Sequence, residues 1–187
     1  AILSNGDGAG NNLFFPWDVA VGGADDVFVV GTGGFGTTNV FRITTGGVIT
    51  EIIDASGDGL GNPLADPWWL ASDATGNAYV TGRGSDNAFE ITPAGVRTEV
   101  IDASGDGAHP LDEANGVAVG PGGVVYVSGR LSDNVFRIDP GGSITQILDA
   151  SGDGTGNTLD GPGDLAVDTA GNLFVAGTLS DNVFHVT

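Results

Sequence analysis

Short apolar segments alternate with glycine-rich polar turns along the whole chain, and they recur in a fixed order. Each repeat begins with a brief apolar segment, passes through a turn such as "DATGN" to a second segment such as "AYVT", and crosses an Asn-containing loop to a third such as "AFEI". A Gly/Pro turn then leads to a fourth segment such as "VRTEVI". The segments are short, rich in β-branched and aromatic residues, and lack a 3.6-residue period. The pattern predicts an all-β chain.

Four units emerge when the chain is aligned on one alanine of the first segment. The aligned residues are Ala20, Ala71, Ala118 and Ala166, at spacings of 51, 47 and 48 residues. This period is typical of a propeller blade. The second segments are apolar at consecutive positions, as expected for strands buried on both faces. We therefore predict one domain over residues 1–187, a β-propeller with four blades of four antiparallel strands. The approximate units are 1–54, 55–102, 103–149 and 150–187.

The two ends of the sequence bear on how the last blade is completed. The fourth unit stops after its third strand, whereas "AIL" at 1–3 is similar to the end of a fourth strand, "QIL" at 146–148. We expect Ala1–Leu3 to complete the last blade, either within the same chain or in a neighbouring one. An uncovered edge strand favours self-association.

Two stretches, "GPGDLAVDTAGNLFVAGTLSDNVFHV" and "ANGVAVGPGGVVYVSGRLSDNVFRI", resemble NHL repeats, and the resemblance extends to all four units. It implies a propeller fold, although NHL propellers usually have six blades. Relatives of these propellers include lactone hydrolases and lyases with a metal in the central channel. The sequence departs from the family in its four units and in an added acidic hexapeptide.

The charge of the chain limits its partners. It carries 24 acidic and five basic residues, for a net charge of −19, so we expect neither nucleic acid nor insertion into a membrane. A surface with this much negative charge is expected to attract cations. Cysteine is absent, which excludes thiolate catalysis and disulfides. The acidity and the glycine-rich repeats favour an extracellular or cell-surface location. N-glycosylation sequons are lacking, while O-linked glycan and a glycan or surface partner remain open.

The added hexapeptide, "DASGDG", occurs at 54–59, 102–107 and 149–154, with a weaker echo "LSNGDG" at 3–8. Its oxygen-bearing residues match positions 1, 3 and 5 of a calcium loop, with glycine at position 6. The predicted Ca²⁺ ligands are Asp102, Ser104, Asp106 and Glu113 in unit three, Asp149, Ser151, Asp153 and Asp160 in unit four, and Asp54, Ser56 and Asp58 in unit two. We expect units three and four to bind better than unit two, and unit one to be empty. The alternative is that these residues simply build tight loops.

Other polar and aromatic residues have structural interpretations. The repeated "SDN" at 85–87, 132–134 and 180–182 is typical of an Asx turn. His109 is expected in a solvated loop and His185 in blade packing, while Arg83 and Arg130 are expected to pair with carboxylates. The tryptophans Trp17, Trp68 and Trp69 fit core packing, or stacking on a sugar ring if exposed.

The main functional hypothesis is a non-enzymatic, extracellular structural or adhesive module that assembles head-to-tail into a filament. The first alternative is a propeller hydrolase or lyase with a metal in its central channel. The position aligned with Asp18 is occupied by Trp69, Gly116 and Asp164 in the later units, so two carboxylates could meet across the ring. The second alternative is a ligand-binding module of a larger surface protein.

Overall fold

The chain folds into four consecutive antiparallel sheets in the computed structural model, which describes residues 6–33 and 37–187. Blade 1 consists of β1 (Pro16–Val21), β2 (Val27–Gly33), β3 (Thr37–Ile43) and β4 (Ile49–Asp54). Blade 2 consists of β5 (Pro67–Ser72), β6 (Ala78–Gly82), β7 (Asn87–Ile91) and β8 (Arg97–Ile101). Blade 3 consists of β9 (Ala114–Val119), β10 (Val125–Gly129), β11 (Asn134–Ile138) and β12 (Ile144–Leu148). Blade 4 consists of β13 (Pro162–Val167), β14 (Leu173–Gly177) and β15 (Asn182–Val186).

Each sheet is a simple meander in which consecutive strands pair, so the predicted propeller architecture is confirmed. The first strand of blade 1 was predicted over Val19–Val21, and it begins earlier, at Pro16. The reason is that pairing with the second strand continues beyond a bulge, with Pro16 opposite Gly31. The strand expected from Ala1–Leu3 lies outside the described residues. Helical structure in the described part is limited to the 3₁₀ turns Gly23–Asp25 and Pro121–Gly123, and no helix there is long and apolar enough to cross a membrane.

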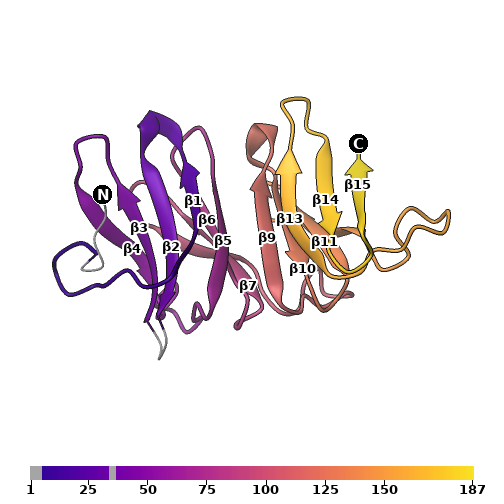
Figure 1. Ribbon diagram of the computed structural model, residues 1–187, viewed down its shortest axis with the longest axis horizontal. Helices are drawn as coiled ribbons and strands as arrows, with labels where there is room; N and C mark the ends of the chain where they lie inside the picture. Colours follow the sequence, from indigo (N-terminus) through magenta and orange to yellow (C-terminus); the bar gives the residue numbers. More distant parts are fainter. Residues whose placement is uncertain (1–5, 34–36) are drawn as a thin grey trace.

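The four blades stand side by side in chain order. The inner strands β1, β5, β9 and β13 contact one another in that order, while β4 and β15 lie at opposite ends of the row (Figure 1). The described blades therefore form an open arc rather than a closed ring.

Most of the apolar core lies between neighbouring blades. Phe28 and Val30 of blade 1, for example, belong to one buried cluster with Leu70 and Val80 of blade 2, and similar clusters join blades 2 and 3 and blades 3 and 4. The second strands β6 and β10 are thus buried on both faces, as predicted, whereas in β14 of blade 4 Phe174 is exposed. A phenylalanine of each third strand is buried at the same aligned position, namely Phe41, Phe89, Phe136 and Phe184.

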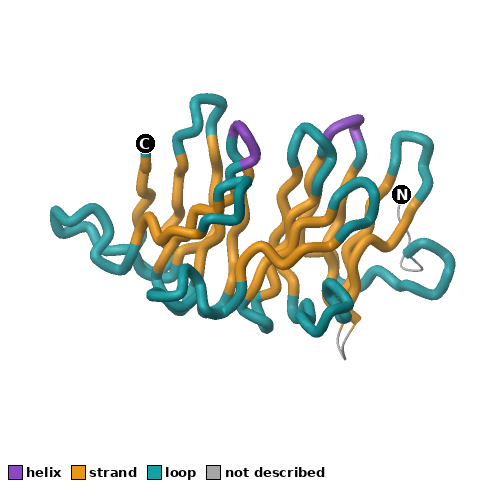
Figure 2. Tube along the Cα trace, turned by 180° about the vertical axis from the view of Figure 1, so that it is seen from behind, coloured by secondary structure: helices purple, strands orange, loops and turns teal. Residues whose placement is uncertain are grey.

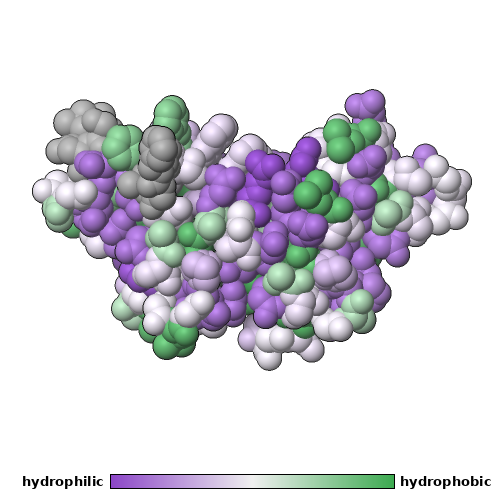
Figure 3. Space-filling model, turned by 90° about the horizontal axis from the view of Figure 1, so that it is seen from below, coloured by the Kyte–Doolittle hydropathy of each residue, from purple (hydrophilic) through white to green (hydrophobic). Residues whose placement is uncertain are grey.

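One face of the arc carries two sets of loops. The loops that lead into the first strands are hydrogen-bonded to the loops between second and third strands, through Arg83 N–H to Asp66 O at 3.2 Å and Arg130 N–H to Glu113 O at 2.9 Å. Both sets lie along the lower side of the molecule (Figure 2). We call this side the acidic face because it carries the hexapeptide loops. Figure 3 views it directly and shows an outline with a notch between two lobes.

Candidate functional site

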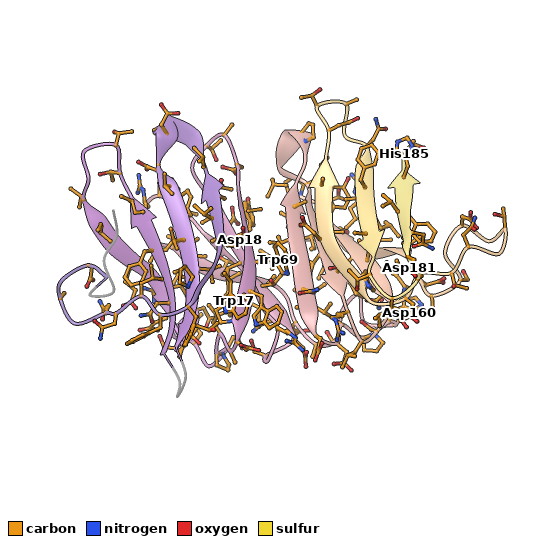
Figure 4. All side chains as sticks on the ribbon, viewed as in Figure 1. Trp17, Asp18, Trp69, Asp160, Asp181 and His185 are labelled. Carbon is orange, nitrogen blue, oxygen red and sulfur yellow. The ribbon has the colours of Figure 1, made fainter. Side chains whose placement is uncertain are left out.

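The beginnings of the inner strands converge on the acidic face and carry the polar and aromatic residues of the candidate site. Trp17 and Asp18 start β1, Trp68 and Trp69 start β5, and Asp164 follows the first two residues of β13. Trp17, Asp18 and Trp69 gather near the middle of the row, between the inner strands (Figure 4). The propeller fold thus brings side chains from distant parts of the sequence to one axial region.

Asp18 accepts hydrogen bonds from blades 1 and 2, and its charge acts on Asp164 of blade 4. One of its carboxylate oxygens accepts the Val19 N–H at 2.7 Å, and the other accepts the Leu70 N–H of blade 2 at 3.0 Å. Asp164 of blade 4 accepts the Leu165 N–H at 2.8 Å. Although part of its side chain reaches solvent, burial raises the pKa of Asp164, and the negative charge of Asp18 raises it further, against the lowering effect of that hydrogen bond. The charge of Asp18 therefore adds to the effect of burial at Asp164.

An aromatic and cationic array lies beside these carboxylates. The rings of Trp17 and Trp68 are stacked, with centroids 4.9 Å apart and planes at 10°. The Arg83 guanidinium lies 4.3 Å from the centroid of the Trp68 ring, a cation–π arrangement. Trp17 remains 53% exposed, and its Nε1–H donates to Thr32 Oγ1 at 2.9 Å. Much of the Trp17 side chain therefore contacts solvent, so core packing alone does not explain its position.

Glu113 joins the array to blade 3. Arg83 and Arg130 donate to its two carboxylate oxygens, at 2.9 and 3.0 Å. The hydrogen bond from Arg83, followed by that from Arg130, lowers the pKa of Glu113. The predicted pairing of both arginines with carboxylates is confirmed. Because Glu113 was also a predicted calcium ligand, a cation there would compete with two guanidinium groups.

The carboxylates of the hexapeptides are engaged in their own turns. The first aspartate of each copy accepts the N–H and Oγ–H of the serine two residues later, as Asp102 does from Ser104. The second accepts backbone N–H groups and a side-chain partner, as Asp153 does from Asn157. These hydrogen bonds lower the pKa of the aspartates concerned, which are Asp54, Asp58, Asp106, Asp149 and Asp153.

This local bonding matches the alternative in which the repeats build tight loops. Within residues 6–33 and 37–187, the His, Asp and Glu side chains form no group of three or more that could hold a metal ion. Calcium binding, including any contribution from the exposed Asp160, stays a prediction.

The absence of a metal-binding group among the described residues also concerns the propeller axis, where a metal was part of the first alternative function. Both oxygens of Asp18 already accept backbone N–H groups, and neither Asp18 nor Asp164 belongs to a group of three or more His, Asp and Glu side chains in the described part of the chain that could hold a metal ion. The donor set of a single chain therefore does not fit a resident metal, and we assign no chemical step to one.

The "SDN" triplets do more than the predicted turn. Asn87 donates to Pro63 O of the loop entering its own blade, at 3.0 Å. Asp86 accepts the Glu113 N–H of the following blade at 2.8 Å. An Asx interpretation considers only neighbours in sequence, so it missed this connection between blades.

His109 lies in the solvated loop that was predicted, whereas His185, predicted in blade packing, is exposed on blade 4. His109 is exposed in its loop, with Nδ1 3.1 Å from the carboxylate of Asp106. The His185 ring stacks on Phe174 in blade 4, with centroids 4.9 Å apart. These contacts with a loop carboxylate and a blade phenylalanine are structural, and we give neither histidine a catalytic part.

Two clefts lie between blades at the opposite ends of the strands. One of about 410 Å³ separates blades 2 and 3 and is lined by Tyr79, Glu90 and the turn at Pro140. The Tyr79 hydroxyl donates to Glu90 at 3.0 Å, and burial raises the pKa of Tyr79. A similar cleft of about 230 Å³ lies between blades 1 and 2. Because the clefts recur with the blades, we attribute them to the packing of the repeat.

Comparisons with known proteins support the fold. No protein-family model matches the sequence, and no curated protein is similar to it. A streptogramin B lyase structure matches with a TM-score of 0.69 and 15% identity, over 92% of this chain and 51% of that chain. Virginiamycin B lyase from Staphylococcus aureus matches with a TM-score of 0.65 and 17% identity, over 99% and 57%. A gluconolactonase from Xanthomonas campestris matches with a TM-score of 0.63 and 18% identity, over 90% and 56%.

At these identities the likeness shows a β-propeller fold, and the NHL resemblance stays a prediction. The chain spans about half the length of the solved structures that it matches. The main functional hypothesis needs correction, because solved structures with this fold include lyases and a lactonase. They favour the hydrolase or lyase alternative over a structural or adhesive module. The extracellular location and the glycan or surface partner stay predictions.

Proposed function

We propose that this chain is a propeller enzyme of the hydrolase or lyase class that acts on a cyclic ester at the axial end of its inner strands. The observation that carries the proposal is the coupling of Asp18 and Asp164. A carboxyl group whose pKa is raised by burial and a like charge is a suitable general base. Solved structures of a lactonase and of lyases with the same fold support this class of reaction.

Asp164 is the proposed base and Asp18 a positioning residue that raises its pKa. As a hydrolase, Asp164 takes a proton from water as the water oxygen attacks the ester carbonyl. The carbon–oxygen bond of the ring then breaks, and the leaving oxygen receives that proton. As a lyase, Asp164 instead takes a proton from the carbon next to the one that bears the ester oxygen. The electron pair of that carbon–hydrogen bond forms a carbon–carbon double bond, the bond from the neighbouring carbon to the ester oxygen breaks, and the ester leaves as a carboxylate. The proton then passes from Asp164 to water. Trp17 and Trp68 offer a flat apolar surface for a ring, and Arg83 adds positive charge beside it.

The test is hydrolysis of an aldonolactone, monitored by proton release, together with opening of a cyclic depsipeptide, monitored by liquid chromatography with mass spectrometry. Hydrolysis adds the mass of a water molecule, whereas elimination leaves the mass unchanged and shifts the retention time. We expect Asp164→Asn to lower kcat by about a hundredfold or more. The matched control is Asp25→Asn, an exposed carboxylate in a turn at the opposite ends of the strands. If the wild type opens neither ester, or if Asp164→Asn is as active as the control, the proposal is wrong.

A second candidate, a ligand-binding module, is favoured by the exposed Trp17 ring and by a likeness to an auxiliary nutrient binding protein from Bacteroides ovatus. That structure matches with a TM-score of 0.66 and 15% identity, over 94% of this chain and 49% of that chain. Titration with sugars, in which binding is monitored by tryptophan fluorescence, separates the two functions. A pure binding module would lose its signal in Trp17→Ala and keep it in Asp164→Asn.

A further inference from the structure

The clefts between blades 1 and 2 and between blades 2 and 3, called the first and the second cleft, lie at equivalent junctions. Packing of the repeat explains why both exist, but it does not explain why their lining differs. Two arginines and one carboxylate line the first cleft, namely Arg42, Arg97 and Glu51. Among the described residues, the second cleft is lined by no arginine and by four carboxylates, namely Asp73, Glu90, Glu99 and Asp139. The second cleft is also the larger, at about 410 Å³ against about 230 Å³.

A guanidinium group from the neighbouring blade lies in the first cleft. Arg97 of blade 2 donates its Nε–H to the carbonyl oxygen of Ile52 in blade 1, at 2.7 Å. Ile52 is left without a cross-strand partner at the irregularity in the register of β3 and β4, as is usual for the extra residue of a bulge. The first cleft therefore shows how this junction binds a guanidinium group.

The second cleft keeps the bulge and lacks the arginine. Val100 is the equivalent residue, without a cross-strand partner between β7 and β8, and it lines the cleft. Ile144 of blade 3 occupies the position aligned with Arg97, and it packs against the apolar cluster of this junction. The Val100 carbonyl therefore lacks the guanidinium group that the Ile52 carbonyl accepts in the first cleft.

Glu90 places a carboxylate in the second cleft where the first has Arg42. In blade 1, Arg42 donates its Nε–H to Asp26 at 2.6 Å. In blade 2, the Tyr79 hydroxyl donates to Glu90 Oε1 at 3.0 Å, and Glu90 Oε2 has no hydrogen-bond partner within the part of the chain that the structure describes. One oxygen is thus held by Tyr79, and the other is available to a donor from a ligand.

The other carboxylates of the second cleft are engaged within the protein. Asp73 accepts from Asn77 at 2.9 Å, and Glu99 accepts from Asn87 at 2.8 Å. Asp139 pairs with Arg137 at 2.7 Å. Because amide partners leave the charges of Asp73 and Glu99 uncompensated, these two residues favour a cation in the cleft over a neutral or anionic ligand.

We propose that the second cleft binds an organic cation from outside these blades, with a guanidinium group on a short apolar stem. The guanidinium would donate to the free oxygen of Glu90 and to the Val100 carbonyl. The stem would lie against Val125 and Ile138, which line the cleft and are each 4% exposed. A volume of about 410 Å³ is in the range of small-molecule sites.

The test is isothermal titration calorimetry with n-butylguanidinium, and with n-butylurea as a neutral ligand of similar shape. We expect one site that binds the cation and not the urea. Glu90→Gln keeps the size of the side chain and removes its charge, so it should raise the dissociation constant about tenfold or more. Asp25→Asn is the matched control, because it changes the net charge equally, in a turn at the same ends of the strands, and Asp25 lines neither cleft.

A second variant supplies the guanidinium group from the chain itself. Ile144→Arg restores the arginine that blade 2 has at the aligned position, so its side chain should enter the second cleft and abolish binding of n-butylguanidinium. An unchanged circular dichroism spectrum would show that the variant is folded. Binding that persists in the folded variant would overturn the proposed place of the site.

A blocked tripeptide with a central arginine distinguishes two sources of the ligand. Tighter binding of the peptide than of n-butylguanidinium would identify an arginine side chain of a protein, and equal or weaker binding a free small molecule. Equal binding of the urea and the cation, several weak sites, or a Glu90→Gln variant that binds as tightly as the control would overturn the proposal. The titrations use no ester, and the cleft lies at the strand ends opposite the axial site, so failure here leaves the proposed activity untouched.

Discussion

Two nearly identical turns allow the energy of a blade junction to be measured. Asp133 and Asp181 both occupy the sequence "LSDNVF", with φ angles of 49° and 53°, but only Asp133 has a following blade in the described chain. Replacing either residue by alanine removes the short polar side chain that lets aspartate tolerate the left-handed region, at a cost of about 1 kcal/mol that is common to both. Asp133→Ala additionally leaves the buried Gly161 N–H without its acceptor. An unsatisfied buried donor that had a charged partner costs about 1.5–3 kcal/mol.

The measurement is equilibrium unfolding of both variants in urea. With an m-value of about 2 kcal/mol/M, the midpoint of Asp133→Ala should lie about 1 M below that of Asp181→Ala. Equal midpoints would mean that the Asp133 carboxylate stabilises only its own turn and not the junction with blade 4.

Further outcomes follow from the core, the loops and the site. Phe89→Ala empties a fully buried position and should lower the free energy of unfolding by about 3–5 kcal/mol in the same assay. Hydrogen bonds lower the pKa of Asp153 from 3.8 to about 2, so its contribution to stability is full above pH 4 and lost as the pH falls through 2. The melting temperature should fall over that range, and less so in Asp153→Asn. Asp18→Asn removes a charge that raises the pKa of Asp164, so the acidic limb of the pH–rate profile should move to lower pH. Calcium binding by the hexapeptide loops predicts a melting temperature that EDTA lowers, and an unchanged curve would count against it.

The fold was largely predictable because its signals are local. The second strand of blade 2, "AYVT" at 78–81, is an apolar run flanked by Asn and Gly, and the structure buries it on both faces. Its repetition at a blade-length period specifies the architecture. The starts of the first strands were missed because each of these strands continues to pair with the second strand beyond a bulge that precedes Val19 or its equivalent. The residues at a bulge do not follow a regular alternation of apolar and polar positions.

The site was predictable only in part. Aligning the units brought Asp18 and Asp164 to the same position, and the structure couples them through charge. The array of Trp68, Arg83 and Glu113 was not anticipated as a unit, because its members come from three separate loops and strands. The calcium spacing was correct as a count, but the turns also satisfy their carboxylates internally, which a count of positions cannot reveal.

The two ends of the described row differ from the blade junctions in exposure and not in residue type. Val183 and Val19 have ordinary residue types for their strands, and only their exposure differs from that of their equivalents. A sequence pattern reports which positions are apolar, but it does not report which face a neighbouring blade covers. The repeat therefore predicted the blades, whereas the open arc of the described residues could be seen only in the structure.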